Sequence, residues 1–204
     1  LATGTNGIVD GLVSLIGTGA TVHKLTAADA DGVSFNTSSK FVAGAGLSGN
    51  PFGNVTAGSV VFISGSEMEQ VSGANPFAIA AGVVTFQTGS LYKITGATFT
   101  PSFSGRTYAN VQIDAVGYSV SSTGGSPLSI DDLTITNGTQ NLNLTGGISI
   151  KGNISVAAGA TLGFSPATAN TLFFNGTASQ SINNLGTISF NGNLNVNMNM
   201  NINR

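Results

Sequence analysis

The chain has 204 residues, of which only 7% are charged, with six basic and eight acidic side chains and no cysteine. The missing cysteines exclude disulfides and thiolate metal sites, and so few basic residues exclude the positive field that gathers nucleic-acid phosphates. No apolar run reaches the roughly 18 residues of a membrane helix. We therefore expect no nucleic-acid partner, no membrane insertion, and a polar surface of Ser, Thr, Asn and Gly, which suits stacked strands.

Residues 1–30 are predicted to form an N-terminal cap or a first coil of a β-structure. Within this segment, residues 8–16 fit a short amphipathic helix as well as a capping strand, and both interpretations stay open. The chain begins at Leu and shows no signal peptide, so we expect it to be a mature or excerpted segment of a secreted protein.

An internal repeat occupies residues 31–127. It consists of Phe, two residues, a small residue, Ser, one residue and a large apolar residue, and it begins at Phe35, Phe62 and Phe86, which are 27 and 24 residues apart. A second element accompanies it: Asn-Pro-Phe occurs at 50–52 and 75–77, and Pro-Ser-Phe at 101–103 is a degenerate third copy. Repeats of this length are typical of solenoids.

The repeat predicts an all-β fold, a parallel β-helix with coils of about 24–27 residues stacked at roughly 4.8 Å. About eight such coils would use the whole chain. The repeated Phe residues are expected to stack in register inside the coils. Proline cannot donate a hydrogen bond to a neighbouring strand, so each Asn-Pro-Phe is expected at a corner.

Residues 128–204 are predicted to be an Asn-rich continuation of the solenoid. Apolar and polar residues alternate in short runs such as Leu-Ser-Ile at 128–130 and Ile-Ser-Ile at 148–150, and Gly and Asn separate the runs. The Ser- and Gly-rich stretch 121–127 is the one expected boundary or long loop.

The C-terminal stretch 194–202 alternates apolar residues with Asn, as a strand with one buried face does. An uncovered strand edge pairs with any strand that is offered. We therefore expect this edge to be covered by further coils or by another copy of the chain, which would be self-association through residues 194–202. The Asn residues from 191 to 203 would then form side-chain ladders; otherwise they face solvent.

Several segments resemble large secreted cell-surface repeat proteins of Bacteroidota. These are Ser-Gly-Asn-Pro-Phe-Gly at 48–53, Gly-Ser-Leu-Tyr at 89–92, Ser-Gly-Arg-Thr-Tyr-Ala-Asn at 104–110, Asn-Gly-Thr-Ala-Ser-Gln-Ser-Ile at 175–182 and Phe-Asn at 190–191. The resemblance covers about residues 31–204 and implies an exported β-helical repeat region, similar to substrates of the type IX secretion pathway. The C-terminal sorting domain of such proteins has no counterpart here, which leaves the export route open.

Acidic pairs supply the first candidates for chemistry. Asp29 and Asp31 alternate in a turn, as calcium ligands do, but an EF-hand loop needs more oxygens and a distal Glu, so a solvated loop is preferred. Glu67 and Glu69 would face the same side of a strand, where paired carboxylates can act on a glycan. The next repeat has no acid at these positions, which favours a charged outer face.

Asp131 and Asp132 are adjacent and would point to opposite faces of a strand, although at a bend they could converge on Ca²⁺. A β-helical polysaccharide lyase would also need a base, and only Lys151 lies within about one coil of them.

Arg106 and His23 are the remaining candidates. The Arg106 guanidinium is expected to stack on Tyr108 or Tyr92, or to bind carbonyls at a corner, in preference to a ligand. His23 is the only histidine. A multi-histidine metal site is therefore excluded, a catalytic triad is not expected, and His23 is expected in a turn or at the surface.

These considerations assign no catalytic, cofactor-binding or metal-binding residue, and we expect a protein that is not an enzyme. The preferred function is an extracellular structural segment, a stalk or filament of an adhesin-like surface protein. The alternative is a module that binds glycan or another surface, although the Thr positions do not recur at the coil period, which weakens ice binding in particular. A β-helical polysaccharide lyase or hydrolase is disfavoured because charged residues are scarce.

Overall fold

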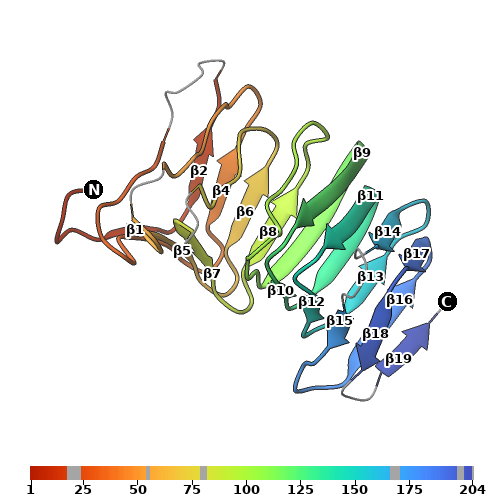
Figure 1. The fold of residues 1–204 in the computed structure, drawn as a ribbon. Coiled ribbons are helices and arrows are strands. Elements are labelled where there is room, and N and C mark those ends of the chain that lie inside the picture. The colour runs from red at the N-terminus through yellow and green to blue at the C-terminus, as the bar shows by residue number, and fades with distance from the viewer. Residues whose placement is uncertain (18–23, 54–55, 79–81, 166–170, 197–199, 204) are drawn as a thin grey trace. The chain divides into compact units, whose positions relative to one another are not determined.

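The structure, a computed structural model, describes residues 1–17, 24–53, 56–78, 82–165, 171–196 and 200–203. Over these residues the chain is all-β, and its parallel strands stack as a β-solenoid, which confirms the predicted parallel β-helix, with about seven turns instead of about eight. The described residues contain no helix that could span a membrane. The chain divides into two compact units, Leu1–Pro101 and Ser102–Arg204 (Figure 1).

In the first unit, each coil contributes one strand to each of two parallel sheets. One sheet is built from β1 (Gly7–Val9), β3 (Val33–Phe35), β5 (Val60–Phe62) and β7 (Val84–Phe86). The other contains β2 (Leu12–Leu15), β4 (Lys40–Ala43), β6 (Glu67–Gln70) and β8 (Leu91–Ile94). The stretch 8–16 therefore contributes to two strands, β1 and β2, and forms no helix.

The three repeated phenylalanines stack inside the first unit, as the repeat predicts. The strand register aligns Phe35 with Phe62 and Phe62 with Phe86. The ring centroids are 4.5 Å and 5.2 Å apart, and the rings are nearly parallel, with interplanar angles of 9° and 16°. All three side chains are buried. We call these three residues the phenylalanine ladder.

The Asn-Pro-Phe segments form turns, and their phenylalanines close the core beside the ladder. Phe52 and Phe77 are buried, and each ring lies edge-on at 6.1 Å from a ladder ring, that of Phe62 or Phe86. In the second copy the Asn75 side chain accepts a hydrogen bond of 2.8 Å from the Phe77 backbone N–H, which fixes the turn locally. The prediction that these segments lie at corners is confirmed.

In the second unit the strands form three parallel faces. One face contains β10 (Leu128–Ile130), β12 (Ile148–Ile150), β15 (Thr171–Phe174) and β18 (Asn193–Val196). A second face is formed by the first halves of two long strands, β9 (Asn110–Gly124) and β11 (Leu133–Leu144), which pair side by side. β13 (Ile154–Val156), β16 (Gln180–Asn184) and β19 (Met200–Asn203) follow β11 in this face, each paired with the one before. The third face is formed by the second halves of β9 and β11, with β14 (Thr161–Phe164) paired to β11 and β17 (Thr187–Phe190) paired to β14.

A shift in the strand register marks the corner where β9 and β11 pass from one face to the next. Gly138 lies at this corner with a φ of 93°, and a Cβ there would come within 2.8 Å of the Ala115 carbonyl oxygen. Only glycine tolerates both conditions without strain. The stretch 121–127 differs from the expected boundary or long loop, because β9 extends to Gly124 and only residues 125–127 separate it from β10.

The C-terminal stretch 194–202 falls in β18 and β19, with residues 197–199 outside the described part of the chain. β19 pairs with β16 and has no second partner strand among the described residues. Self-association through this edge stays a prediction. The asparagine side chains that the structure describes here are exposed, as in the solvent-facing alternative: Asn193, Asn195, Asn201 and Asn203.

Candidate functional site

The carboxylates of Glu67 and Glu69 lie on the same side of β6 and both bind Lys40 from the neighbouring strand β4. The Lys40 Nζ is 2.9 Å from Glu67 Oε1 and 2.7 Å from Glu69 Oε2. Glu69 also accepts a hydrogen bond of 2.8 Å from the Thr95 hydroxyl. These residues therefore form a small ionic cluster across two adjacent strands.

The charges of this cluster oppose acid–base chemistry. Partial burial would raise the pKa of Glu69, but the hydrogen bonds from Lys40 and Thr95 outweigh it, and the pKa is lowered. For Lys40, partial burial would lower the pKa, but the bonds to Glu67 and Glu69 outweigh it, and the pKa is raised. A general acid at neutral pH needs a raised carboxyl pKa. Glu69 is held ionised instead, which suits a structural ion pair.

The remaining acidic candidates are spread over turns. Asp29 accepts a hydrogen bond from the Gly4 backbone N–H, whereas Asp31 is exposed in its turn. Asp132 Oδ1 accepts a hydrogen bond of 2.5 Å from the Asn153 backbone N–H. This bond fixes the turn between β12 and β13. Among the described residues, no group of three or more His, Cys, Asp or Glu side chains could hold a metal ion.

Lys151, the base that a lyase would need, is exposed. Arg106 donates from Nε to the Ser102 hydroxyl over 3.4 Å. Tyr108, one of its expected stacking partners, is fully buried, and burial raises the pKa of its phenol well above the usual range. The Tyr108 hydroxyl donates to the Ser102 carbonyl over 2.5 Å. His23 lies outside the described residues.

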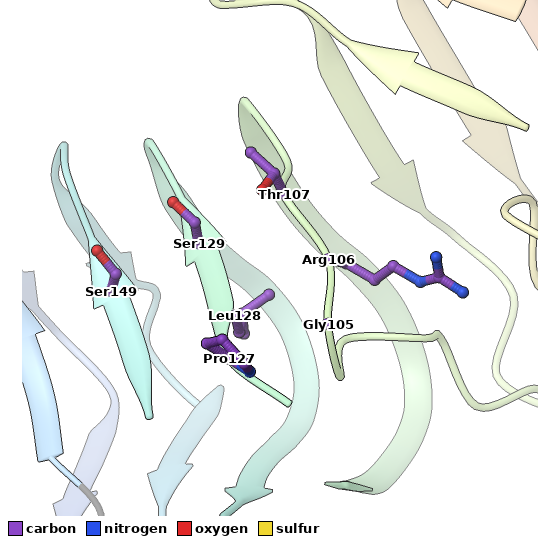
Figure 2. A pocket seen from close by; sticks show the side chains of 7 residues that line it. All are labelled: Gly105, Arg106, Thr107, Pro127, Leu128, Ser129 and Ser149. Atoms are coloured by element: carbon purple, nitrogen blue, oxygen red, sulfur yellow. The ribbon is translucent and has the colours of Figure 1, made fainter. Parts of the chain in front are cut away.

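A shallow pocket of about 310 Å³ lies on the second unit. It is lined by Gly105, Arg106, Thr107, Pro127, Leu128, Ser129 and Ser149. The strand pairing sets Thr107 beside Ser129 and Ser129 beside Ser149, so that three hydroxyl side chains form one column, which we call the hydroxyl column. Figure 2 shows the three side chains on the same side of neighbouring chain segments, while the Arg106 side chain extends away from them.

Within the hydroxyl column, the three side chains differ in their partners. The Ser149 hydroxyl donates to Asn175 Oδ1 over 2.7 Å. The Ser129 Oγ exposes less than 1 Å² and has no hydrogen-bond partner. A shielded hydroxyl without a partner is uncommon in proteins and calls for an explanation, such as a bound ligand or water. The pocket therefore offers uncharged hydroxyls for binding and no residue suited to acid–base catalysis.

Sequence reasoning did not single out this pocket, although part of its signal is present. Leu-Ser-Ile at 128–130 and Ile-Ser-Ile at 148–150 share one pattern 20 residues apart, which predicts Ser129 and Ser149 on the outer side of adjacent strands. Thr107 carries no comparable signal, since it joins the column through a single isolated bridge.

Comparison with known proteins identifies no relative: no family model, no curated protein and no solved structure matches the chain.

Proposed function

We propose that this chain is a non-catalytic structural segment, a stalk or filament, of an extracellular adhesin-like surface protein. The observation that carries the proposal is the phenylalanine ladder, which runs through three successive coils of the first unit with its rings 4.5 Å and 5.2 Å apart. A core that repeats from coil to coil lets a solenoid extend by adding coils, because each coil packs mainly on its neighbours.

The composition of the chain is compatible with an extracellular location. A chain with 7% charged residues and no cysteine relies on burial and backbone pairing for its stability. Neither requires a reducing or an oxidising compartment, so the protein can fold outside the cell without disulfides. The resemblance of residues 31–204 to secreted Bacteroidota surface proteins points in the same direction.

The enzymatic alternative is disfavoured by the positions of the acidic residues. Glu67 and Glu69 share one lysine, and Asp132 binds a backbone N–H. Retaining and inverting glycosidases instead need one carboxyl group that stays protonated opposite a second one. Glu69 does not meet that requirement, because its pKa is lowered.

Incubation of the chain with cellulose, xylan, pectin and chitin is therefore expected to release no new reducing ends. The matched control is the same protein after heat unfolding, which should give the same signal. The non-catalytic assignment fails if native protein releases products and if Glu67→Ala, Glu69→Ala, Asp131→Ala or Asp132→Ala abolishes that release while the variant stays folded.

A further inference from the structure

We propose that the pocket on the second unit binds a neutral, extended oligosaccharide along the hydroxyl column. This binding activity goes beyond the structural role proposed above and does not depend on it. The argument rests on the spacing of the hydroxyls, the unpaired Ser129 Oγ, the apolar groups beside them and the orientation of Arg106 away from the column.

The spacing of the hydroxyls suits an extended ligand. Thr107, Ser129 and Ser149 lie on adjacent parallel segments, which are spaced by about 4.8 Å. Hydroxyls on successive strands with that spacing lie beyond the roughly 3 Å reach of a direct hydrogen bond. Thr107, the exposed member of the column, can therefore donate and accept toward a ligand. A linear pyranose chain presents hydroxyls at regular intervals of similar length and can bridge successive positions of the column.

The Ser129 Oγ is the observation that points to a ligand. It is shielded from solvent and has no hydrogen-bond partner. Leaving such a group unpaired destabilises the protein. A rotation of the Ser129 side chain about χ1 would turn its Oγ toward the pocket. A sugar hydroxyl there supplies the missing partner, because it can donate and accept at once. Asn175, which accepts the hydrogen bond from Ser149, offers its amide N–H groups to the same ligand.

Apolar groups lie beside the hydroxyls, as a pyranose ring requires. A pyranose carries hydroxyls on its rim and C–H groups on its faces, so its sites combine a few polar side chains with apolar surface. Pro127 lines the pocket, and its side chain is exposed. The column continues in register from Ser149 to Phe173, whose side chain is half-buried on the outer side of β15. The Phe173 ring therefore adds an apolar surface to the site on the next strand, β15.

The charges favour a neutral ligand over an acidic one. Among the described residues that line the pocket, Arg106 is the only charged one. Its side chain extends away from the hydroxyl column (Figure 2), and its Nε donates to Ser102. An acidic sugar would therefore find no cation facing it among the described residues that line the pocket, where its carboxylates would lose hydration without compensation. The exposed Lys151 lies outside this lining, two residues beyond Ser149.

The test is a titration of the full chain, labelled with ¹⁵N, with cellotetraose, a neutral and extended tetrasaccharide, followed by NMR. We expect amide shifts concentrated at residues 127–130 and 147–150 and at Phe173, with an affinity measured from the same titration. Ser129→Ala and Phe173→Ala should each weaken that affinity at least fivefold. Thermal unfolding of Ser129→Ala should be unchanged or occur at a higher temperature, because the deleted hydroxyl has no partner to lose.

The matched control is Ser155→Ala. Ser155 lies on β13, on a neighbouring face, where the register aligns it with Thr134 and Asn183, so the same change outside the pocket should leave the affinity unaltered. The proposal is overturned if cellotetraose causes no shifts up to its solubility limit, or if Ser129→Ala and Ser155→Ala weaken binding equally. Tighter binding of tetragalacturonate than of cellotetraose would also overturn it, because it would show an acidic ligand.

Discussion

Replacing Phe62 by Ala is expected to lower the unfolding free energy of the first unit by about 3–5 kcal/mol, as for other buried aromatic residues. The Phe62 ring is fully buried and lies between Phe35 and Phe86, with centroid distances of 4.5 Å and 5.2 Å. Phe52 contacts it from the side at 6.1 Å. The substitution leaves a cavity in the middle of the ladder, and neighbouring strands cannot close it without breaking their register. Urea unfolding followed by circular dichroism measures the loss.

Phe190→Ala is the control for Phe62→Ala, since it deletes the same atoms from a stacked ring. Phe190 is 44% exposed and stacks on Phe164 from one side only, at 5.3 Å. Its removal should cost less than half as much as the removal of Phe62. A loss for Phe62→Ala as small as that for Phe190→Ala would mean that the buried ladder ring contributes no more to stability than an exposed stacked ring.

Replacing Gln140 by Leu is expected to destabilise the second unit by about 3 kcal/mol or more, although the two side chains have similar volume. Gln140 is buried, and its Oε1 accepts a hydrogen bond of 2.6 Å from the Tyr118 hydroxyl. Its Nε2 donates to the Ser122 hydroxyl over 3.0 Å and to the Asn141 carbonyl over 2.8 Å. Leucine leaves the buried Tyr118 and Ser122 hydroxyls without this partner, and each unpaired group costs about 1–3 kcal/mol.

Gln112→Leu provides the matched comparison on an outer face. Gln112 is half-buried and donates a single hydrogen bond of 2.9 Å to the Thr136 hydroxyl. Its groups can turn to water after the substitution, so the unfolding free energy should change by no more than about 0.5 kcal/mol. If Gln140→Leu were tolerated as well as Gln112→Leu in urea unfolding, the buried network would contribute nothing to stability.

The part of the fold that the sequence predicts is the part encoded by repetition. Phe35, Phe62 and Phe86 recur within a shared motif, and residues that recur at the coil period must align in stacked strands. The same alignment places Lys40 opposite Glu67, so the ion pair between them follows from the repeat once the register is accepted. Alternation of apolar and polar residues predicts the short strands of the second unit, for instance β12, with both Ile148 and Ile150 buried.

The features that could not be predicted depend on chain paths without a repeating signal. Gln70 is buried because the Tyr92 hydroxyl, 22 residues later in the chain, donates to its side chain over 2.5 Å. The sequence around Gln70 does not indicate that a tyrosine one coil later would supply a hydrogen bond to a buried glutamine. The pocket likewise requires the isolated bridge from Thr107 to Ser129. The corner at Gly138 likewise lies inside β11, where the register with β9 shifts and no repeated residue marks the position.

The most direct measurement of the proposed role is antibody labelling of intact cells that produce the protein. An antibody raised against the folded chain should label cells without permeabilisation, and permeabilisation should not increase the signal substantially. An antibody against a cytoplasmic protein, applied in parallel, verifies that the cells are intact. Labelling that appears only after permeabilisation would contradict an extracellular structural segment.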